Sequence, residues 1–148
     1  MIVLDTNVVS ELMRAEPTPS VLRWVDAQDA GKLWLTSVTV QELIHGIERL
    51  PVGKRQRQLN AHLLEMLDDD FAGQVAPYDG EAAAIAGRLL ARCEREGRTM
   101  PLADAQIAAI CLALHATLVT RNTQDFEVAG LTLVNPWDEF HEKGPSST

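Results

Sequence analysis

The sequence is poor in cysteine and aromatic residues and contains no long apolar run. Its two cysteines, Cys93 and Cys111, lie in segments whose apolar spacing predicts helices, so no disulfide framework is expected. Aromatic residues make up 5% of the chain, and we expect the three tryptophans to pack in the core or at an interface. No run approaches the roughly 20 apolar residues that span a bilayer, and no basic segment resembles the start of a signal peptide. These absences predict a cytoplasmic protein without a membrane anchor.

Basic charge is also scarce. Thirteen Lys and Arg residues face 21 Asp and Glu residues, which gives a net charge of −8. A broadly basic surface that neutralises nucleic-acid phosphates is therefore excluded. Any nucleic-acid chemistry requires local basic patches or bound metal ions, and the acidity alternatively suits a basic protein partner. The one compact basic cluster comprises Arg49, Lys54, Arg55 and Arg57, which is either a solvated helix face or a site of RNA contact.

Two common kinds of metal site are not predicted. The four histidines show no ligand spacing for zinc. Three consecutive acids at residues 68–70 lack the later Gly and Glu of a calcium loop. We expect these acids to stop the preceding helix, because negative charge at a helix C-terminus opposes the helix dipole.

Strand-like and helix-like segments alternate along the 148 residues. Short apolar runs typical of buried strands cover residues 2–4, 33–36, 74–78, 117–120 and 131–134. Helical periodicity covers residues 8–13, 21–29, 40–50, 54–67, 79–96 and 101–114. This alternation predicts an α/β fold with three layers, α/β/α, around a central, mainly parallel sheet. One domain is expected over residues 1–141, followed by a disordered tail over residues 142–148.

Polar residues follow the predicted strands at one edge of that sheet. Asp5 ends the first strand, and Glu42 follows the second strand within about one helical turn. Asp104 lies in the first turn of a later helix, while Asn122 and then Asp125 follow the strand at residues 117–120. Ligands and catalytic groups collect at the carboxyl edge of open α/β sheets. The topology therefore predicts that these side chains converge.

Each of these residues also has a simpler explanation. Asp5 and Asn7 can cap a helix, Glu42 can be a solvated helix residue, and Asp104 can favour a helix dipole. Considered together, three carboxylates at one edge repel one another unless a cation is present. Carboxylate oxygens suit Mg²⁺ or Mn²⁺, and ions held in this way activate water and clamp a phosphodiester during in-line displacement.

Four ordered motifs in the chain resemble those of the PIN-domain ribonucleases. They are IVLDTN at residues 2–7, VQEL at 40–43, PLADAQIAA at 101–109 and TRNTQDF at 120–126. The resemblance extends to VNPW at residues 134–137 and is closest to the VapC-type toxins of bacterial toxin–antitoxin modules, including the FitB-like branch. It covers nearly the whole chain in the correct order, which makes it specific.

The resemblance implies an endoribonuclease that depends on Mg²⁺ or Mn²⁺. By position, Asp5, Glu42 and Asp104 would be the acidic triad, with Asp5 and Asp104 as direct metal ligands and Glu42 binding a second ion or orienting water. Asn122 stands where some family members have an acid, so it would hold metal-bound water or bond to Thr6 or Asp5. Supporting roles fall to a further group of residues, Thr6, Asn7, Thr120 and Asp125.

The same resemblance implies partners. It implies an RNA substrate, a small cognate antitoxin whose C-terminal segment enters the active-site groove, and a homodimer of the toxin. Toxin–antitoxin pairs of this kind bind operator DNA through the antitoxin.

Two other functional classes compete with the nuclease. A phosphatase with Asp5 as covalent nucleophile normally has a second aspartate two residues later, where this chain has Asn7. A non-catalytic subunit of an antitoxin-dependent DNA-binding repressor complex is compatible with the same fold. Cleavage of RNA distinguishes this second class from the nuclease.

Overall fold

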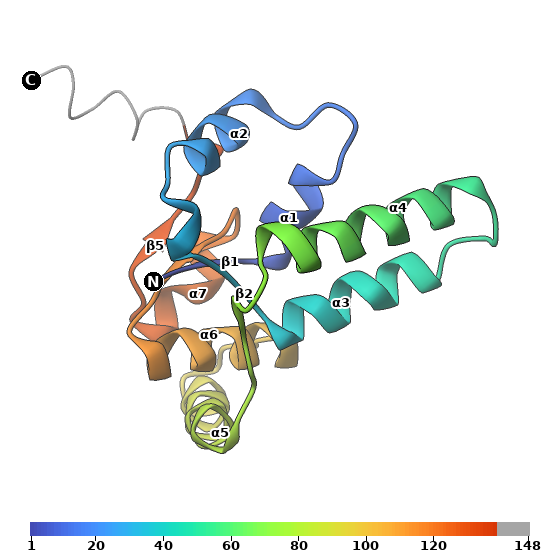
Figure 1. The fold of residues 1–148 in the computed structure, drawn as a ribbon. Helices are drawn as coiled ribbons and strands as arrows, with labels where there is room; N and C mark the ends of the chain where they lie inside the picture. The colour runs from blue at the N-terminus through green and yellow to red at the C-terminus, as the bar shows by residue number, and fades with distance from the viewer. Residues whose placement is uncertain (139–148) are drawn as a thin grey trace, which may run out of the picture.

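The computed structural model describes residues 1–138 and contains a parallel sheet of five strands in that part of the chain. The strands are β1 (Ile2–Leu4), β2 (Leu33–Thr36), β3 (Val75–Ala76), β4 (Thr117–Val119) and β5 (Leu133–Val134), in the order β3-β2-β1-β4-β5. Every pairing is parallel. This arrangement confirms the predicted α/β class, and β1 lies at the centre of the sheet (Figure 1).

Seven α-helices connect these strands within residues 1–138. They are α1 (Thr6–Leu12), α2 (Pro19–Asp26), α3 (Ser37–Glu48), α4 (Lys54–Glu65), α5 (Gly80–Arg95), α6 (Leu102–Leu114) and α7 (Thr123–Phe126). Short 3₁₀ turns cover Ala30–Lys32 and Glu127–Ala129, and a π-helical turn covers Met66–Asp70. Helices α3 and α4 form a hairpin that extends beyond the sheet (Figure 1). None of the described helices is long and apolar enough to cross a membrane.

Successive residues of the central strands face opposite helical layers. Val3 and Leu118 belong to the core formed with α5 and α6, whereas Leu4 and Val119 belong to the core formed with α1, α3 and α4. All four side chains are fully buried. Because side chains alternate across a strand, a sheet covered by helices on both faces has apolar runs without polar alternation. This confirms the three-layer prediction.

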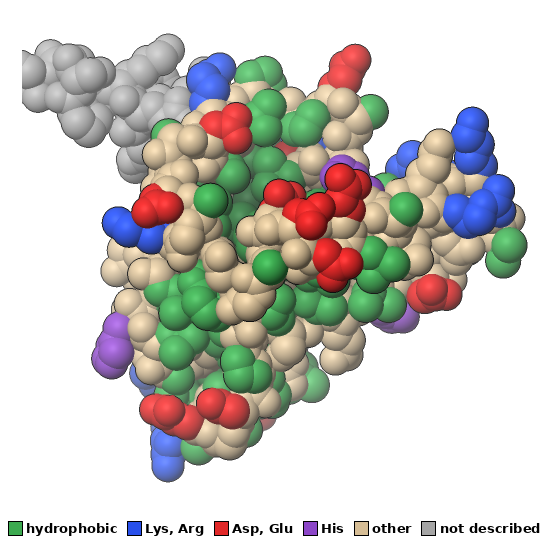
Figure 2. All heavy atoms as spheres, viewed as in Figure 1, with side chains coloured by type: hydrophobic (Ala, Val, Ile, Leu, Met, Phe, Trp, Pro, Cys, Tyr) green, Lys and Arg blue, Asp and Glu red, His purple; other side chains and the backbone are tan. Residues whose placement is uncertain are grey.

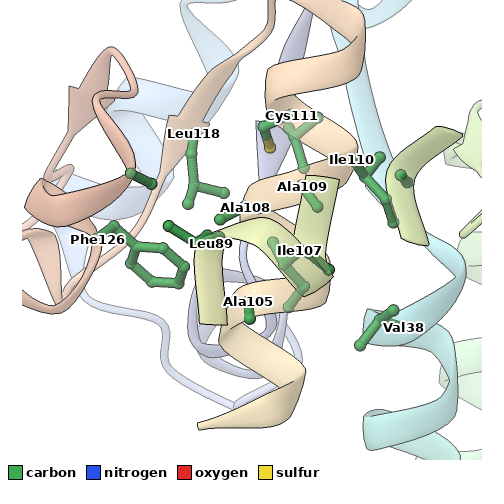
Figure 3. Packing of buried hydrophobic residues seen from close by; sticks show 14 of the residues in the cluster. Val38, Leu89, Ala105, Ile107, Ala108, Ala109, Ile110, Cys111, Leu118 and Phe126 are labelled. Atoms are coloured by element: carbon green, nitrogen blue, oxygen red, sulfur yellow. The ribbon is translucent and has the colours of Figure 1, made fainter. Parts of the chain in front are cut away.

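Helix α6 is buried around most of its circumference. Ala105 and Ala108 are small enough to let α5 approach, and Ile107, Leu89 of α5 and Phe126 of α7 belong to the same buried cluster (Figure 3). Burying these side chains contributes roughly 1.5–3 kcal/mol for each of the larger ones. This packing fixes the N-terminal turn of α6, which carries Asp104.

Several boundary predictions were wrong in detail. Residues 68–70 do not simply stop α4: the α-helix ends at Glu65 and the chain continues as the π-helical turn Met66–Asp70. The last strand is limited to Leu133–Val134, since the 3₁₀ turn and Gly130, with φ of +73°, precede it. The predicted disordered tail over residues 142–148, and residues 139–141 of the predicted domain, lie outside the described residues.

The less common side chains mostly pack as expected. Both cysteines are buried with free thiols, and burial raises the pKa of the Cys111 thiol to about 12. Trp24, Trp34 and Trp137 are half-buried against the two cores. The guanidinium of Arg121 lies 5.0 Å from the ring centroid of Trp137, which is a cation–π contact. The tryptophans thus contribute to packing.

A buried carboxylate ties α1 to the start of α2. Glu11 accepts hydrogen bonds from the Thr18 amide at 2.8 Å, the Thr18 hydroxyl at 3.0 Å and the Arg14 guanidinium at 3.1 Å. The hydrogen bond from the Thr18 backbone amide holds the pKa of Glu11 below its ordinary value. The glutamate therefore stabilises the loop that anchors the far end of α1.

We expect Glu11→Ala to lower the free energy of unfolding by about 2 kcal/mol, because the partly buried Thr18 amide loses its acceptor. A Glu16→Ala control, at an exposed position, should change stability by less than about 0.5 kcal/mol. Since the folded-state pKa of Glu11 is lowered, its contribution is present above pH 4.5 and is lost as the pH falls below that value. Urea unfolding at pH 7 and pH 3 measures both effects, and equal stability of the two variants would contradict this role.

Candidate active site

Asp5 lies at the end of β1, where the chain turns into α1. Its backbone N–H donates to the Val119 carbonyl at 2.9 Å, which fixes it against β4. One carboxylate oxygen accepts from the Thr6 amide at 2.8 Å, so Asp5 does cap α1. The other oxygen accepts from the Thr120 hydroxyl at 2.8 Å and from the Asn7 amide group at 3.4 Å. The side chain is only 4% exposed, so it is held in one orientation by the ends of two strands.

Thr120 connects the ends of β1 and β4. Its buried hydroxyl donates to Asp5 and accepts from the Asn122 backbone N–H at 3.1 Å and the Asn7 side-chain amide at 3.3 Å. The Asn7 side-chain oxygen in turn accepts from the Arg121 backbone N–H at 3.3 Å. The supporting residues Thr120 and Asn7 therefore hold the carboxylate of Asp5.

Asn122 is placed differently from one of its predicted roles. Its side chain is exposed and makes no hydrogen bond to Thr6 or Asp5; its backbone N–H bonds Thr120 instead. The reason is that Asn122 directly precedes α7 and has an irregular backbone, with φ of −99° and ψ of 54°. The side chain is thus available to solvent at the rim of the site.

Glu42 reaches the same edge from α3 and is held by a row of threonine hydroxyls. The Thr6 hydroxyl donates to one Glu42 carboxylate oxygen at 2.7 Å and lies 3.0 Å from the Thr39 hydroxyl. Thr39 lies in turn 3.4 Å from the Thr36 hydroxyl, which caps α3 by accepting from the Thr39 amide at 3.0 Å. Since a carboxylate only accepts, each hydroxyl has one available direction: Thr36 donates to Thr39, Thr39 to Thr6 and Thr6 to Glu42.

For the ribonuclease activity that the resemblance of the motifs implies, this row predicts that the Thr39 hydroxyl supports catalysis without touching substrate. We expect Thr39→Val to lower the rate of RNA cleavage by about tenfold, since Thr6 loses a donor that fixes its own bond to Glu42. Thr39→Ser keeps the hydroxyl and should retain most of the rate. Single-turnover kinetics with saturating enzyme measures the effect. Equal rates for the valine and serine variants would show that the row only packs the helix terminus.

Asp104 completes the acidic group. It is half-buried in the first turn of α6. Burial, and then the negative charges of Asp5, Asp125 and Glu42 in that order, together raise its pKa from 3.8 to about 6. Burial likewise raises the pKa of Asp5 against the opposing effect of its hydrogen bonds, with Glu42 adding to the rise. The structure therefore brings the three predicted acids together, and Asp125, although exposed, acts on the same group.

The carboxylates of this site suit a hard divalent cation that takes its remaining ligands from water and phosphate. Within residues 1–138, no three Asp, Glu, His or Cys side chains lie so that they could hold a metal ion among themselves. Mg²⁺ commonly uses only one or two carboxylates and completes its shell with water and phosphate oxygens. The repulsion that raises the pKa of Asp104 is the electrostatic cost that such an ion would remove.

Sequence reasoning missed parts of this site. Thr36 and Thr39 were not predicted as site residues, although a threonine directly before a helical segment is a typical N-cap. Of the basic cluster, Arg55 lines a groove beside Glu42, together with Arg14, which was also missed. The whole cluster is exposed, and Lys and Arg side chains gather at the tip of the α3–α4 hairpin (Figure 2).

The sequence of this chain is similar to those of a known family and of named proteins. The family profile described as "PIN domain" matches residues 2–131. Plasmid stability protein StbB of Pseudomonas syringae pv. tomato is 46% identical over 138 residues, covering 93% of this chain and 99% of StbB. VapC ribonuclease Y4jK of Sinorhizobium fredii is 43% identical over 142 residues, covering 93% of this chain and 99% of that protein.

A solved structure is similar in fold as well as in sequence. The structure of FitAB bound to a DNA fragment contains a chain that matches with a TM-score of 0.86 and 33% identity, covering 93% of this chain and 96% of that one. The match extends over almost the whole length of both chains, so it includes every element that carries the acidic group.

Proposed function

The chain belongs to the PIN domain family, and we propose that it is the toxin of a toxin–antitoxin module, an endoribonuclease that depends on Mg²⁺ or Mn²⁺. One observation carries this proposal: Asp5, Glu42 and Asp104 come from three separate elements and meet at one sheet edge, where they repel one another. The mutual repulsion of these carboxylates lowers the stability of the folded protein. A bound cation would remove this repulsion, so such a group is expected where a cation binds.

Each residue has a role in this mechanism. Asp5, held by Thr120 and Thr6, and Asp104 would bind the metal through carboxylate oxygens. When bound, the ion lowers the pKa of a water molecule and neutralises charge on the phosphodiester. Glu42, held through one oxygen by Thr6, keeps its second oxygen to orient that water or a second ion. Asn122 and Asp125 lie at the rim, where they can contact water or substrate.

The relatives support an antitoxin partner. A related solved complex is named FitAB and is bound to DNA, which supports a small antitoxin partner for this chain and operator DNA bound through that partner. A segment of the antitoxin would occupy the active-site groove and inhibit cleavage. We further propose a homodimer acting on RNA in the cytoplasm. The acidic net charge of −8 argues that the chain alone has little affinity for DNA.

The test is cleavage of defined RNAs by the protein purified away from any partner. We expect cutting of labelled tRNA or mRNA fragments that requires Mg²⁺ or Mn²⁺ and stops when EDTA is added. A folded protein that cuts none of these RNAs with either metal would contradict the proposal. It would favour the alternative, in which the chain is a non-catalytic subunit of a DNA-binding repressor complex.

A further inference from the structure

A groove leads away from the acidic group between α1, α3 and α4. It has a volume of about 280 Å³ and begins at Thr6 and Glu42, which also belong to the catalytic edge. Its floor is apolar and lacks aromatic residues, being formed by side chains such as those of Met13, Leu43 and Ile47. The groove is therefore a continuation of the site along the α3–α4 hairpin.

Gly46 forms part of the wall of this groove. It lies one helical turn after Glu42, in the interior of α3, where glycine is the least favourable residue after proline. A Cβ atom at this position would meet no atom within 4 Å, so packing within residues 1–138 does not require glycine here. Gly87 of α5 has the same open surroundings but lies outside the groove, which makes it a matched control. Gly46 differs from Gly87 in one respect: a side chain at position 46 would occupy the groove.

Two guanidinium groups line the same groove. Arg14 stands at the end of α1 and Arg55 in the first turn of α4. Arg14 forms an ion pair with Glu11 at 3.1 Å, whereas Arg55 has no carboxylate partner within residues 1–138. Guanidinium groups bind phosphates through paired hydrogen bonds. On a chain with a net charge of −8, the positive charge of Arg55 on a groove that opens at the acidic group favours an anionic ligand.

We propose that this groove receives the RNA strand on one side of the cleaved phosphodiester. This inference rests on the proposed nuclease function and identifies where its substrate lies. The sugar and base would lie on the apolar floor beside Gly46, and an adjoining phosphate would bind Arg55, with Arg14 on the other wall. A volume of about 280 Å³ suits a single nucleotide rather than a duplex. Because the floor offers no aromatic side chains on which bases could stack, the groove would recognise the strand by its shape and its backbone.

Gly46→Gln tests the groove by filling it with an uncharged side chain. We expect this variant to raise the KM for a short single-stranded RNA about tenfold and to leave the fold intact, with Tm raised by about 3 °C because glutamine favours a helix. Gly87→Gln should raise Tm similarly and leave the KM unchanged. The same KM for both variants, in an enzyme that cleaves RNA, would overturn the groove while leaving the nuclease function standing.

Arg55→Gln tests the charge, with Arg88→Gln of α5 as control. RNA affinity is measured by fluorescence anisotropy in the cleavage-deficient Asp5→Asn background, so that binding is read independently of activity. We expect Arg55→Gln to weaken binding several-fold and to reduce the slope of log affinity against log salt by about 0.7, the effect of one single-strand phosphate contact. An unchanged slope and affinity for Arg55→Gln would overturn the proposal and leave the groove to a protein segment.

Discussion

Replacing Asp5 by Asn is expected to reduce the rate of metal-dependent RNA cleavage roughly 10³-fold. This is the usual loss when a group that stabilises charge in the transition state is removed. The amide lacks the negative charge that binds a divalent ion, while its size and shape are unchanged. Asn is as good a helix cap as Asp, so the Thr6 amide keeps an acceptor. The change also removes a charge that raises the pKa of Asp104.

For these reasons we expect the Asp5→Asn variant to fold normally and to melt within a few degrees of the wild type or above it. Circular dichroism checks the fold, and initial rates on a labelled RNA check activity. Asp125→Asn is the matched control: it also removes a charge that acts on Asp104, but from an exposed position, and it should slow cleavage less than tenfold. Loss of folding in Asp5→Asn would show that Asp5 is structural.

The second large effect concerns stability in the absence of metal. The pKa of Asp104 is raised from 3.8 to about 6 by burial and by Asp5, Asp125 and Glu42. A raised folded-state pKa means that the favourable contribution of protonated Asp104 is present below pH 3.8 and is lost as the pH rises through about 6. Above that pH, ionised Asp104 destabilises the metal-free fold by on the order of 1–2 kcal/mol, because its half-exposed carboxylate is partly screened.

We therefore expect Asp104→Asn to raise the Tm of the metal-free protein at pH 8 by about 3–6 °C and to change it little at pH 4. Asp68→Asn, which removes an exposed charge distant from the site, is the control. Mn²⁺ should raise the wild-type Tm at pH 8 more than at pH 5, since protons compete with the metal. It should do so far less in Asp104→Asn. A stabilisation by Mn²⁺ that is equal in both proteins would place the ion elsewhere.

The sequence was sufficient to predict the sheet and its acidic edge. The strands β1, β2 and β4 are apolar runs with a polar residue at or directly after their ends, as at Leu4 and Asp5, and parallel strands place such ends together. The convergence of Glu42 and Asp104 followed from the same topology. These features depend on residues that are close together in the sequence, so the local sequence pattern predicts them.

Other features depend on how distant elements approach one another. The bond between Thr6 and Thr39 joins α1 to α3, and no spacing along the chain predicts it. The orientation of Asn122 depends on the irregular backbone before α7. The groove at Gly46 exists only because the α3–α4 hairpin packs beside α1. The π-helical turn at Met66–Asp70 likewise falls where the acids alone predicted a stop.

The most direct test of the central claim is the rate of RNA cleavage measured against the amount of bound Mn²⁺ in one preparation. Metal-free protein is titrated with Mn²⁺, bound ion is measured by electron paramagnetic resonance, and cleavage of a labelled RNA is followed at each point. The acidic edge formed by Asp5, Glu42 and Asp104 predicts that cleavage rises in proportion to bound Mn²⁺. It also predicts that both binding and cleavage are lost in Asp5→Asn. Cleavage that is independent of bound Mn²⁺, or tight Mn²⁺ binding that survives in Asp5→Asn, would contradict the assignment of this edge as a metal-dependent nuclease site.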